Sequence, residues 1–308
     1  MLSFILPPFL RGVLCLFFYM LIILVFGVFI YIIAFFKYLI PIRVWQKKCN
    51  HTLNHIPVLW TDANVFFTRM FTRLDVTLIG AENLSKNDWY LMTANHRSWT
   101  DVMILYRVFS HRIPVLKFFM KAPLLWVPIF GVACWLAGFP FMKRYTKEKI
   151  AVKPHLKGKD VIATKKLCSR FREDNMPMSI ISFAEGTRYT SEKAKRQHTP
   201  FKNLLKPRAG ALAYTLMALD ACIDKFLNVT IVYPTGKYQF WDYVCGRVKR
   251  VVIKVECITL DSSLKGNYEE DPHYRVHFQQ WLNVLWERKD KEIDELMRSF
   301  RPSSSHPL

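Results

Sequence analysis

From residue 75 onward, short apolar runs of strand length alternate with stretches in which apolar residues recur at helical spacing. The runs that read as β-strands are residues 75–80, 89–94, 115–120, 179–183, 229–234 and 250–260. The helical stretches are residues 102–109, 161–171, 210–219 and 278–285. Residues 124–139 are apolar but interrupted by proline and glycine, which favours a pair of short helices over a second membrane span. Strands that alternate with helices in this way predict an α/β domain.

The first part of the chain has a different pattern. Residues 13–36 carry no charge, and a helix of that length, at about 1.5 Å per residue, extends roughly 36 Å, enough to cross a bilayer. Basic residues gather after this stretch, starting at Lys37, whereas Arg11 precedes it, so the positive-inside bias predicts that the rest of the chain is cytoplasmic. Because Pro41 can end a long helix, both a single span and a hairpin that enters the membrane and returns are open.

The next segment, residues 42–73, has an amphipathic pattern. Its apolar stripe follows helical spacing and consists of Trp45, Cys49, Leu53 and Ile56. This pattern predicts a helix on the membrane surface. His51 and His55 lie one turn apart within it, but no third ligand is near, so we expect them to be solvated or interfacial and not to bind a metal. The predicted organisation is an anchor (1–41), this interfacial helix (42–73), a main domain (74–300) and a polar tail (301–308).

A candidate catalytic pair lies between the run 89–94 and the helical stretch 102–109. Ser98, followed three residues later by Asp101, is a helix-start signal of the capping-box kind with Asp in place of Glu. The Asp101 carboxylate would reach back toward the turn that contains His96, where it can fix the tautomer of the imidazole and stabilise the imidazolium. His96 is therefore a candidate general base. His155 and Asp160 have the same spacing without a preceding strand, so the spacing alone is weak.

A second polar motif follows the run 179–183 and reads Ala184-Glu185-Gly186-Thr187-Arg188. Gly186 lets the backbone approach a ligand closely, and Arg188 offers a two-pronged guanidinium to phosphate. Glu185 cannot hold a phosphate, so we expect it to position Arg188 or a ligand hydroxyl. The alternative is that Glu185 and Arg188 form a surface ion pair after a strand.

The two motifs, in this order, resemble the glycerolipid acyltransferase family that makes phosphatidic acid from lysophosphatidic acid. The first motif matches in full at Asn95, His96, Ser98 and Asp101. A second family motif matches at Gly138, Phe139, Phe141 and Arg144, with departures at Pro140 and Lys143; in the third, Ala184 replaces a proline. The fourth matches at Val232-Tyr233-Pro234, whereas Thr235 and Gly236 replace the apolar residues that the family has there.

This resemblance implies a mixed sheet flanked by helices, with an N-terminal membrane anchor. It implies transfer of an acyl chain from acyl-CoA or acyl carrier protein to the free sn-2 hydroxyl of 1-acyl-glycerol-3-phosphate, with His96 as the base and Asp101 orienting it. The substrate-binding residues that it implies are Asn95, Ser98, Arg144, Glu185, Gly186, Thr187, Arg188 and Pro234. A thiolate is a good leaving group, so the reaction as written needs neither a bound cofactor nor a metal.

The acyl chain needs an apolar place within reach of His96, and residues 124–139 are the longest apolar run in the main domain. We expect Gly131 or Gly138 to let the chain pass, with Trp126 or Trp135 as a wall. The alternative is that these glycines only break or pack helices.

Parts of the chain resemble a bacterial inner-membrane branch of the family, among them residues 134–135, 140–145, 157–161 and 278–283. That branch is also similar to lysocardiolipin acyltransferases, so the acceptor could instead be lysophosphatidylglycerol or a lysocardiolipin. The predicted location is the bacterial inner membrane, with the catalytic domain on its cytoplasmic face.

Composition narrows the classes of partner. The chain has 44 Lys and Arg against 24 Asp and Glu, a net charge of +20, which favours a phospholipid surface, a phosphorylated substrate or nucleic acid. The 15% aromatic content and the lack of a nucleic-acid-binding motif favour an anionic membrane over nucleic acid. Seven scattered cysteines without a C-x-x-C pair indicate a reducing compartment. The sequence lacks the G-x-S-x-G motif of a serine nucleophile, which argues against a lipid hydrolase. The remaining alternative is a membrane-tethered protein that binds anions without catalysis.

Overall fold

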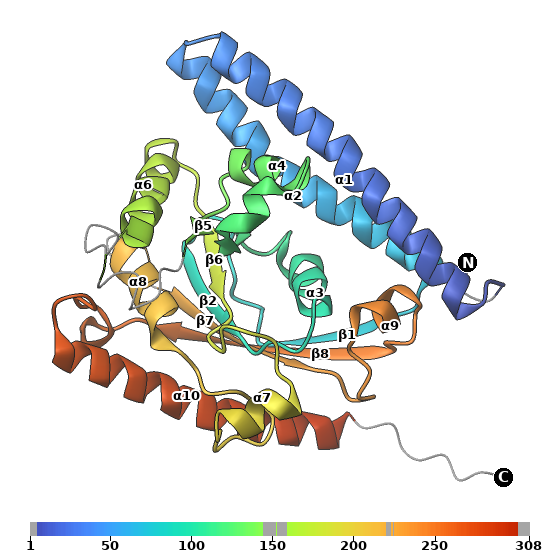
Figure 1. Ribbon diagram of the computed structural model, residues 1–308, viewed down its shortest axis with the longest axis vertical. Coiled ribbons are helices and arrows are strands. Elements are labelled where there is room, and N and C mark those ends of the chain that lie inside the picture. The colour runs from blue at the N-terminus through green and yellow to red at the C-terminus, as the bar shows by residue number, and fades with distance from the viewer. Residues whose placement is uncertain (1–4, 144–151, 153–158, 220–222, 224, 301–308) are drawn as a thin grey trace.

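A six-stranded mixed sheet forms the centre of the protein in the computed structural model, which describes residues 5–143, 152, 159–219, 223 and 225–300 (Figure 1). Its strands are β1 (Asp75–Ile79), β2 (Tyr90–Ala94), β3 (Leu116–Phe118), β6 (Ser179–Ser182), β7 (Lys225–Val232) and β8 (Arg250–Thr259). Their order is β1-β8-β7-β2-β6-β3, and every neighbouring pair is parallel except β7 and β8, which are antiparallel. The predicted α/β class and mixed sheet are confirmed.

Strand β2 is buried along its whole length, because both faces of the sheet are covered. Tyr90, Met92 and Ala94 point into one apolar core, which includes helix α3 (Thr100–Phe109). Leu91 points into the other core. The helices around that second core are α6 (Lys159–Glu173), α8 (Ala209–Leu219) and α10 (Pro272–Ser299). A strand covered on both sides is apolar at every position, which is why residues 89–94 read as a run without alternation.

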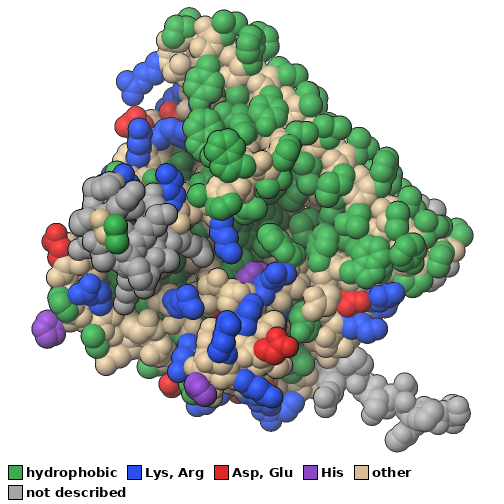
Figure 2. Space-filling model, viewed as in Figure 1, with side chains coloured by type: hydrophobic (Ala, Val, Ile, Leu, Met, Phe, Trp, Pro, Cys, Tyr) green, Lys and Arg blue, Asp and Glu red, His purple; other side chains and the backbone are tan. Residues whose placement is uncertain are grey.

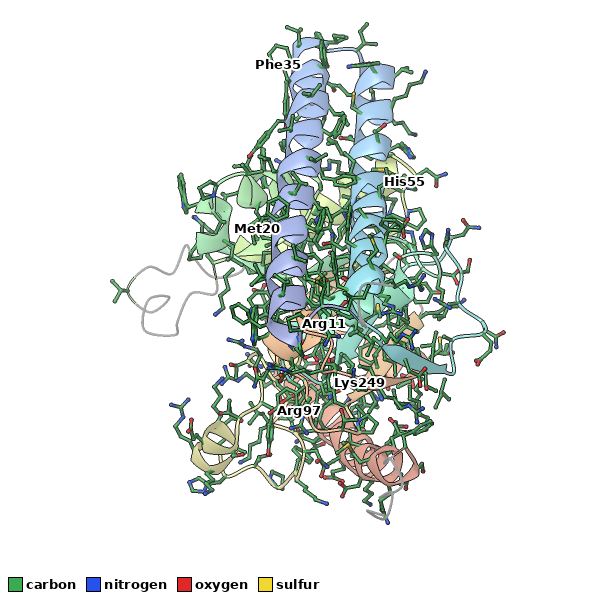
Figure 3. All side chains as sticks on the ribbon, turned by 90° about the vertical axis from the view of Figure 1, so that its right-hand side faces the viewer. Arg11, Met20, Phe35, His55, Arg97 and Lys249 are labelled. Carbon is green, nitrogen blue, oxygen red and sulfur yellow. The ribbon has the colours of Figure 1, made fainter. Side chains whose placement is uncertain are left out.

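The first two helices form an antiparallel hairpin that extends beyond the sheet (Figures 1 and 3). Helix α1 is Pro8–Leu39 and helix α2 is Arg43–Phe71, so Pro41 lies in the turn between them. By length and composition α1 is apolar enough to cross a membrane. One side of α1 packs on the protein, and the other carries exposed apolar side chains, among them Met20 and Phe35.

The predicted helix of residues 42–73 is present as α2, but most of its apolar stripe faces the protein. Leu53 and Ile56 are buried with Ile30 of α1 and Ala133, whereas Trp45 is partly exposed. Most of this stripe thus packs on the protein, and a membrane-surface position of the helix stays a prediction. His51, expected to be solvated or interfacial, is exposed and contacts the main-chain oxygen of Asp174, which ties α2 to the end of α6.

Short elements complete the fold. The predicted helix pair in residues 124–139 appears as the 3-10 helix η2 (Ala122–Trp126) and α4 (Phe130–Leu136), and strands β4 (Met120–Lys121) and β5 (Phe141–Met142) pair beside it. Three further short helices were not predicted: α7 (Ser191–Arg196), α9 (Phe240–Val244) and the 3-10 helix η4 (Ser262–Leu264). Arg144, His155 and the predicted tail (301–308) lie outside the described residues.

Candidate active site

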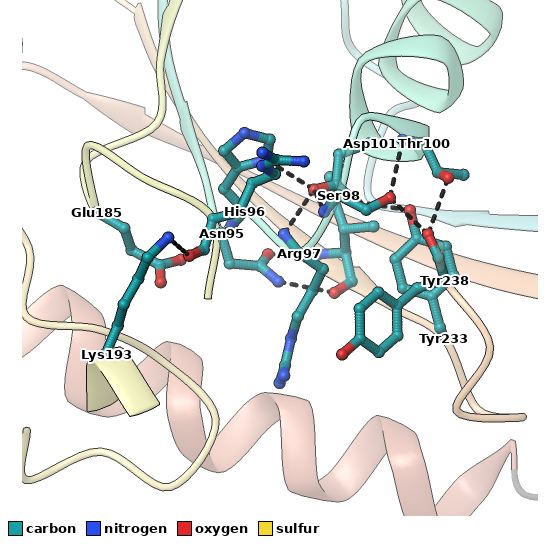
Figure 4. A network of polar contacts seen from close by, with 12 residues as sticks. Asn95, His96, Arg97, Ser98, Thr100, Asp101, Glu185, Lys193, Tyr233 and Tyr238 are labelled. Atoms are coloured by element: carbon teal, nitrogen blue, oxygen red, sulfur yellow. Dashed lines mark hydrogen bonds and ion pairs between the residues drawn. The ribbon is translucent and has the colours of Figure 1, made fainter. Parts of the chain in front are cut away.

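His96 and Asp101 meet in the turn between β2 and α3. The Nδ1 atom of His96 lies 2.8 Å from Oδ2 of Asp101, and the same oxygen accepts hydrogen bonds from the backbone N–H groups of Arg97 and Ser98 (Figure 4). The helix begins at Thr100, between the predicted start signal at Ser98 and the predicted helical stretch 102–109, and the Ser98 hydroxyl accepts the N–H of Thr100. The capping interaction read from the sequence thus also brings the imidazole and the carboxylate together.

The second carboxylate oxygen of Asp101 accepts a 2.6 Å hydrogen bond from the hydroxyl of Tyr233, which follows β7. Burial, together with the charge of Asp101, raises the pKa of Tyr233 well above its ordinary value, so Tyr233 stays protonated and donates. Asp101 is fully buried and can only accept. The hydrogen on the His96 ring therefore sits on Nδ1, and Nε2 keeps its lone pair.

The His96 ring is stacked on Phe183, with ring centroids 4.0 Å apart, and its side chain is 16% exposed. Phe183 comes directly after β6, the strand beside β2 in the sheet. The two parallel strands end at the same edge, which places the second motif next to the first. A ring held on one side by Asp101 and on one face by Phe183 can take a proton at Nε2 without reorienting.

Asn95 and Ser98, both expected to bind substrate, have structural partners. The side chain of Asn95 is buried and exchanges two hydrogen bonds with the backbone of Ile231 in β7, through its amide and its carbonyl oxygen. The Ser98 hydroxyl donates to the main-chain oxygen of Tyr238 and is also buried. Both side chains fix the loop that carries His96, and their part in substrate binding stays a prediction.

Glu185 also differs from the expectation. It is fully buried, and its two oxygens accept hydrogen bonds of 2.9 Å from the backbone N–H groups of His96 and Leu205. Burial raises the pKa of Glu185 to about 7, whereas these two hydrogen bonds act in the opposite direction. Glu185 therefore holds the backbone at His96, and its oxygens bond these two N–H groups instead of the expected Arg188 or the alternative surface ion pair.

The rest of the second motif faces the site. Gly186 has a positive φ of 70°, which favours glycine, and Gly186, Thr187 and Arg188 line the same cavity as His96. Sequence reasoning did not single out Lys193, which is the first cation of α7. Its ammonium donates to the Thr187 hydroxyl at 2.8 Å and to the main-chain oxygen of Arg188 at 3.0 Å.

The cavity beside His96 has a volume of about 530 Å³ and lies where the surface is hollowed between an apolar part and a basic part (Figure 2). Its apolar lining comes from α1, α2, η2 and α4, and includes Phe26, Ile30, Ile56, Leu124, Phe130, Ala133 and Ala137. Two cations, Lys121 and Arg188, line it as well, and the Arg188 guanidinium lies 5.9 Å from the ring of Trp99. Apolar walls and cations close to one histidine suit an amphiphilic substrate.

The residues chosen for the acyl-chain pocket lie elsewhere, although their segment does line the cavity. Trp126 is 85% exposed, and a side chain on Gly131 would lie 2.3 Å from the main-chain oxygen of Leu124, so Gly131 serves close packing. Trp135 and Gly138 line a second, smaller groove. Pro234 is buried just after Tyr233 and is not among the described residues that line the cavity.

A histidine backed by a buried carboxylate thus lies at the edge of an apolar cavity that also holds two cations. Comparison with known proteins gives the family. A model of the acyltransferase family matches residues 75–234, just over half of the chain, and the chain belongs to this family. It is an acyltransferase, and its homologues connect it to phospholipid metabolism.

Three relatives illustrate the similarity. The chain is 24% identical over 287 residues to 1-acyl-sn-glycerol-3-phosphate acyltransferase epsilon of Mus musculus, covering 86% of this chain and 72% of that protein. It is 33% identical over 214 residues to 1-acyl-sn-glycerol-3-phosphate acyltransferase of Saccharomyces cerevisiae, covering 68% of this chain and 62% of that protein. The fold is similar to the crystal structure of the 1-acyl-sn-glycerophosphate (LPA) acyltransferase PlsC from Thermotoga maritima, with a TM-score of 0.54, 16% identity, and coverage of 96% of this chain and 99% of that one.

Proposed function

We propose that this enzyme transfers an acyl chain from a thioester to the free sn-2 hydroxyl of 1-acyl-glycerol-3-phosphate and so forms phosphatidic acid. The observation that carries the proposal is the position of His96. It is hydrogen-bonded to Asp101 and lines a cavity whose other walls are apolar side chains and the cations Arg188 and Lys121. Such a cavity can hold an acyl chain and a phosphate at the same time, with the base between them.

In the reaction, Nε2 of His96 takes the proton of the acceptor hydroxyl while the hydroxyl oxygen attacks the thioester carbonyl. The carbon–sulfur bond then breaks, and the departing thiolate takes the proton from His96, so the enzyme returns to its starting state. Asp101 stabilises the transient imidazolium, and its charge acts in a fully buried place where water screens it little.

The phosphate of the acceptor would bind Arg188, whose loop is held by Lys193, and Lys121 also lines the cavity. The acyl chain would lie along the walls from α1, α2 and α4, where each buried methylene contributes about 0.8 kcal/mol. The co-substrate is acyl-CoA or acyl carrier protein, with no bound cofactor.

The proposed cellular location and the alternative acceptors follow from the sequence. The proposed location is the bacterial inner membrane, with the catalytic domain on its cytoplasmic face and the exposed apolar side of α1 in contact with anionic phospholipid. The alternative acceptors are lysophosphatidylglycerol and lysocardiolipin, which keep the phosphate but extend it. Arg188 and Lys121, the cations that line the cavity, would serve these acceptors too.

The test is to incubate the purified protein with a panel of lysophospholipids and labelled acyl-CoA, and then with acyl carrier protein thioesters. We expect transfer to 1-acyl-glycerol-3-phosphate and none by His96→Ala. Faster transfer to lysophosphatidylglycerol or lysocardiolipin would move the assignment to the remodelling enzymes. Transfer to none of these acceptors would refute the proposal.

A further inference from the structure

A second groove, of about 200 Å³, lies between the end of α1, the segment that follows α4, and α6. Two cations line it, Lys37 from the last turn of α1 and Arg170 from α6, and they are close enough for their charges to repel. The groove shares Phe139 with the active cavity but does not include His96 or Arg188. It is therefore a separate site, and the reaction described above makes no use of it.

The charges in this groove are not balanced. Among the described residues that line it there is no Asp or Glu. Asp174 lies one turn after Arg170, and its charge acts on both Lys37 and Arg170, so one carboxylate beside the groove stands against two cations. Two neighbouring cations with a single carboxylate nearby keep an excess positive charge, which a bound anion would stabilise.

A third cation lies behind the wall of the groove. Lys117 is fully buried, donates to the main-chain oxygen of Ala137 at 2.8 Å, and lies over the rings of Phe139 and Phe171. Burial, reinforced by the charge of Arg170, lowers the pKa of Lys117 to about 7. An anion in the groove would favour the charged form of Lys117 as well, so all three cations point to the same kind of ligand.

The backbone at Gly138 is shaped for this arrangement. Its φ is +78°, and a side chain there would lie 3.0 Å from Nη2 of Arg170 and 2.9 Å from the ring of Phe171. Without a side chain at this position, the guanidinium of Arg170 can lie against the floor of the groove. Gly138, which the sequence suggested for the acyl-chain pocket, thus makes room for a cation.

The rim of the groove is apolar and aromatic. Tyr38 is 61% exposed and Trp135 is 52% exposed, and both border the apolar face of α1 that also carries Phe35 and Phe36. In Figure 2, Lys and Arg side chains lie along the left edge of this apolar face. Exposed Tyr and Trp beside basic residues are typical of the level of phospholipid headgroups.

We propose that this groove binds the phosphate of an anionic phospholipid between Lys37 and Arg170, with the acyl chains of that lipid along the apolar face of α1. The shared chemistry is a phosphate, which free inorganic phosphate could also supply, but the aromatic rim favours the lipid. The bound lipid is a structural or regulatory ligand that holds α1 against α6, outside the active cavity.

The test measures phospholipid retained by the full-length protein, and so does not depend on acyl transfer. The protein is equilibrated with phosphatidylcholine vesicles containing phosphatidic acid, extracted in mild detergent, and analysed by native mass spectrometry. Lys37→Gln combined with Arg170→Gln should lose one retained anionic lipid per chain and bind it at least about tenfold more weakly. Lys47→Gln combined with Lys165→Gln removes the same charge from exposed positions of α2 and α6 outside the groove, and should retain the lipid.

Arg188→Gln empties the proposed phosphate position of the active cavity and should also retain the lipid in the groove. Equal retention of the lipid by the double variant Lys37→Gln/Arg170→Gln and by the matched control would overturn the proposal. Retention lost in the Arg188 variant would instead locate the lipid in the active cavity and overturn it too. A competition arm uses inorganic phosphate: displacement of the lipid at equal concentrations would assign the groove to soluble phosphate.

Discussion

The charge of Asp101 can be removed with little change in shape by Asp101→Asn. Two backbone N–H groups, those of Arg97 and Ser98, donate to the Oδ2 atom that also meets His96. An amide NH2 cannot accept these bonds, so the oxygen of the new amide should take that place and its NH2 should face the hydroxyl of Tyr233, which can turn to accept. The tautomer of His96 then survives, and the variant isolates the effect of charge.

The size of this effect follows from the geometry. The carboxylate interacts with an imidazolium only in the transition state, and the two charge centres are about 4 Å apart, so an effective dielectric constant of about 20 gives about 4 kcal/mol. At about 1.4 kcal/mol for each tenfold, the loss in kcat/KM is about a thousandfold. His96→Ala removes the proton acceptor itself and should lower transfer further, to background.

The assay is acyl transfer at saturating donor, measured on variants whose thermal midpoint shows that they are folded. Asp62→Asn is the matched control, because Asp62 of α2 meets His111 at 2.7 Å in an exposed pair outside the cavity, and it should keep wild-type activity. Activity of Asp101→Asn within tenfold of wild type would show that the buried charge does not assist the reaction. A loss equal to that of His96→Ala would show that the amide turns and changes the tautomer.

Four further outcomes are expected. Arg188→Ala should raise KM for the phosphorylated acceptor more than for the thioester; an equal rise for both would contradict phosphate binding. Lys193→Met should raise the same KM severalfold because the loop loses two hydrogen bonds, Lys193→Arg should restore part of it, and the exposed Lys195→Met should change nothing. Ala133→Leu shortens the apolar part of the cavity, so a donor series should shift toward shorter chains; an unchanged ranking would place the chain elsewhere. The pKa of Glu185 is raised from 4.5 to about 7, so as pH rises through this range wild type should lose about 3 kcal/mol of unfolding free energy that Glu185→Gln does not lose.

The sign of this last effect follows from linkage. A buried acid with a raised pKa gives its full stability below the ordinary value, and loses it as pH rises through the folded value. The pKa of Lys289, a buried lysine of α10, is lowered from 10.5 to about 7, mainly by burial. Lys289 therefore changes the unfolding free energy between about pH 7 and pH 10.5, outside the pH window of Glu185. Parallel curves for wild type and Glu185→Gln between pH 4.5 and 7 would contradict the raised pKa.

Sequence reasoning located the His96–Asp101 pair because every part of that signal is local. A strand, a turn and a capped helix occupy consecutive residues, and the capping interaction alone brings Asp101 back to the turn. Tyr233 is 132 residues away from Asp101, and its contact exists only because β7 lies beside β2 in the sheet. Strand order of this kind leaves no periodic trace in the chain.

The residues predicted for the acyl-chain pocket lie apart from the cavity beside His96 for a related reason. The apolar run 124–139 does line the cavity, but which of its positions face inward depends on how η2 and α4 lie against the hairpin. Glycines were chosen because they lack side chains, whereas in the structure Gly131 and Gly138 are needed by neighbouring backbone and by Arg170. Short apolar residues that were overlooked, such as Ala133 and Ala137, border the space instead.

The wall that α1 contributes to the active cavity has a consequence for how this enzyme can be altered. Phe26 and Ile30 line the cavity from the same helix whose opposite side is apolar and exposed. Truncation of the first 36 residues would therefore not yield a working soluble enzyme, because it would open the active cavity to water. Exchanging α1 for the first helix of a relative would replace part of the cavity wall together with the exposed apolar surface. Substitutions on this one helix can thus change the inside of the cavity and the outer surface of the protein together.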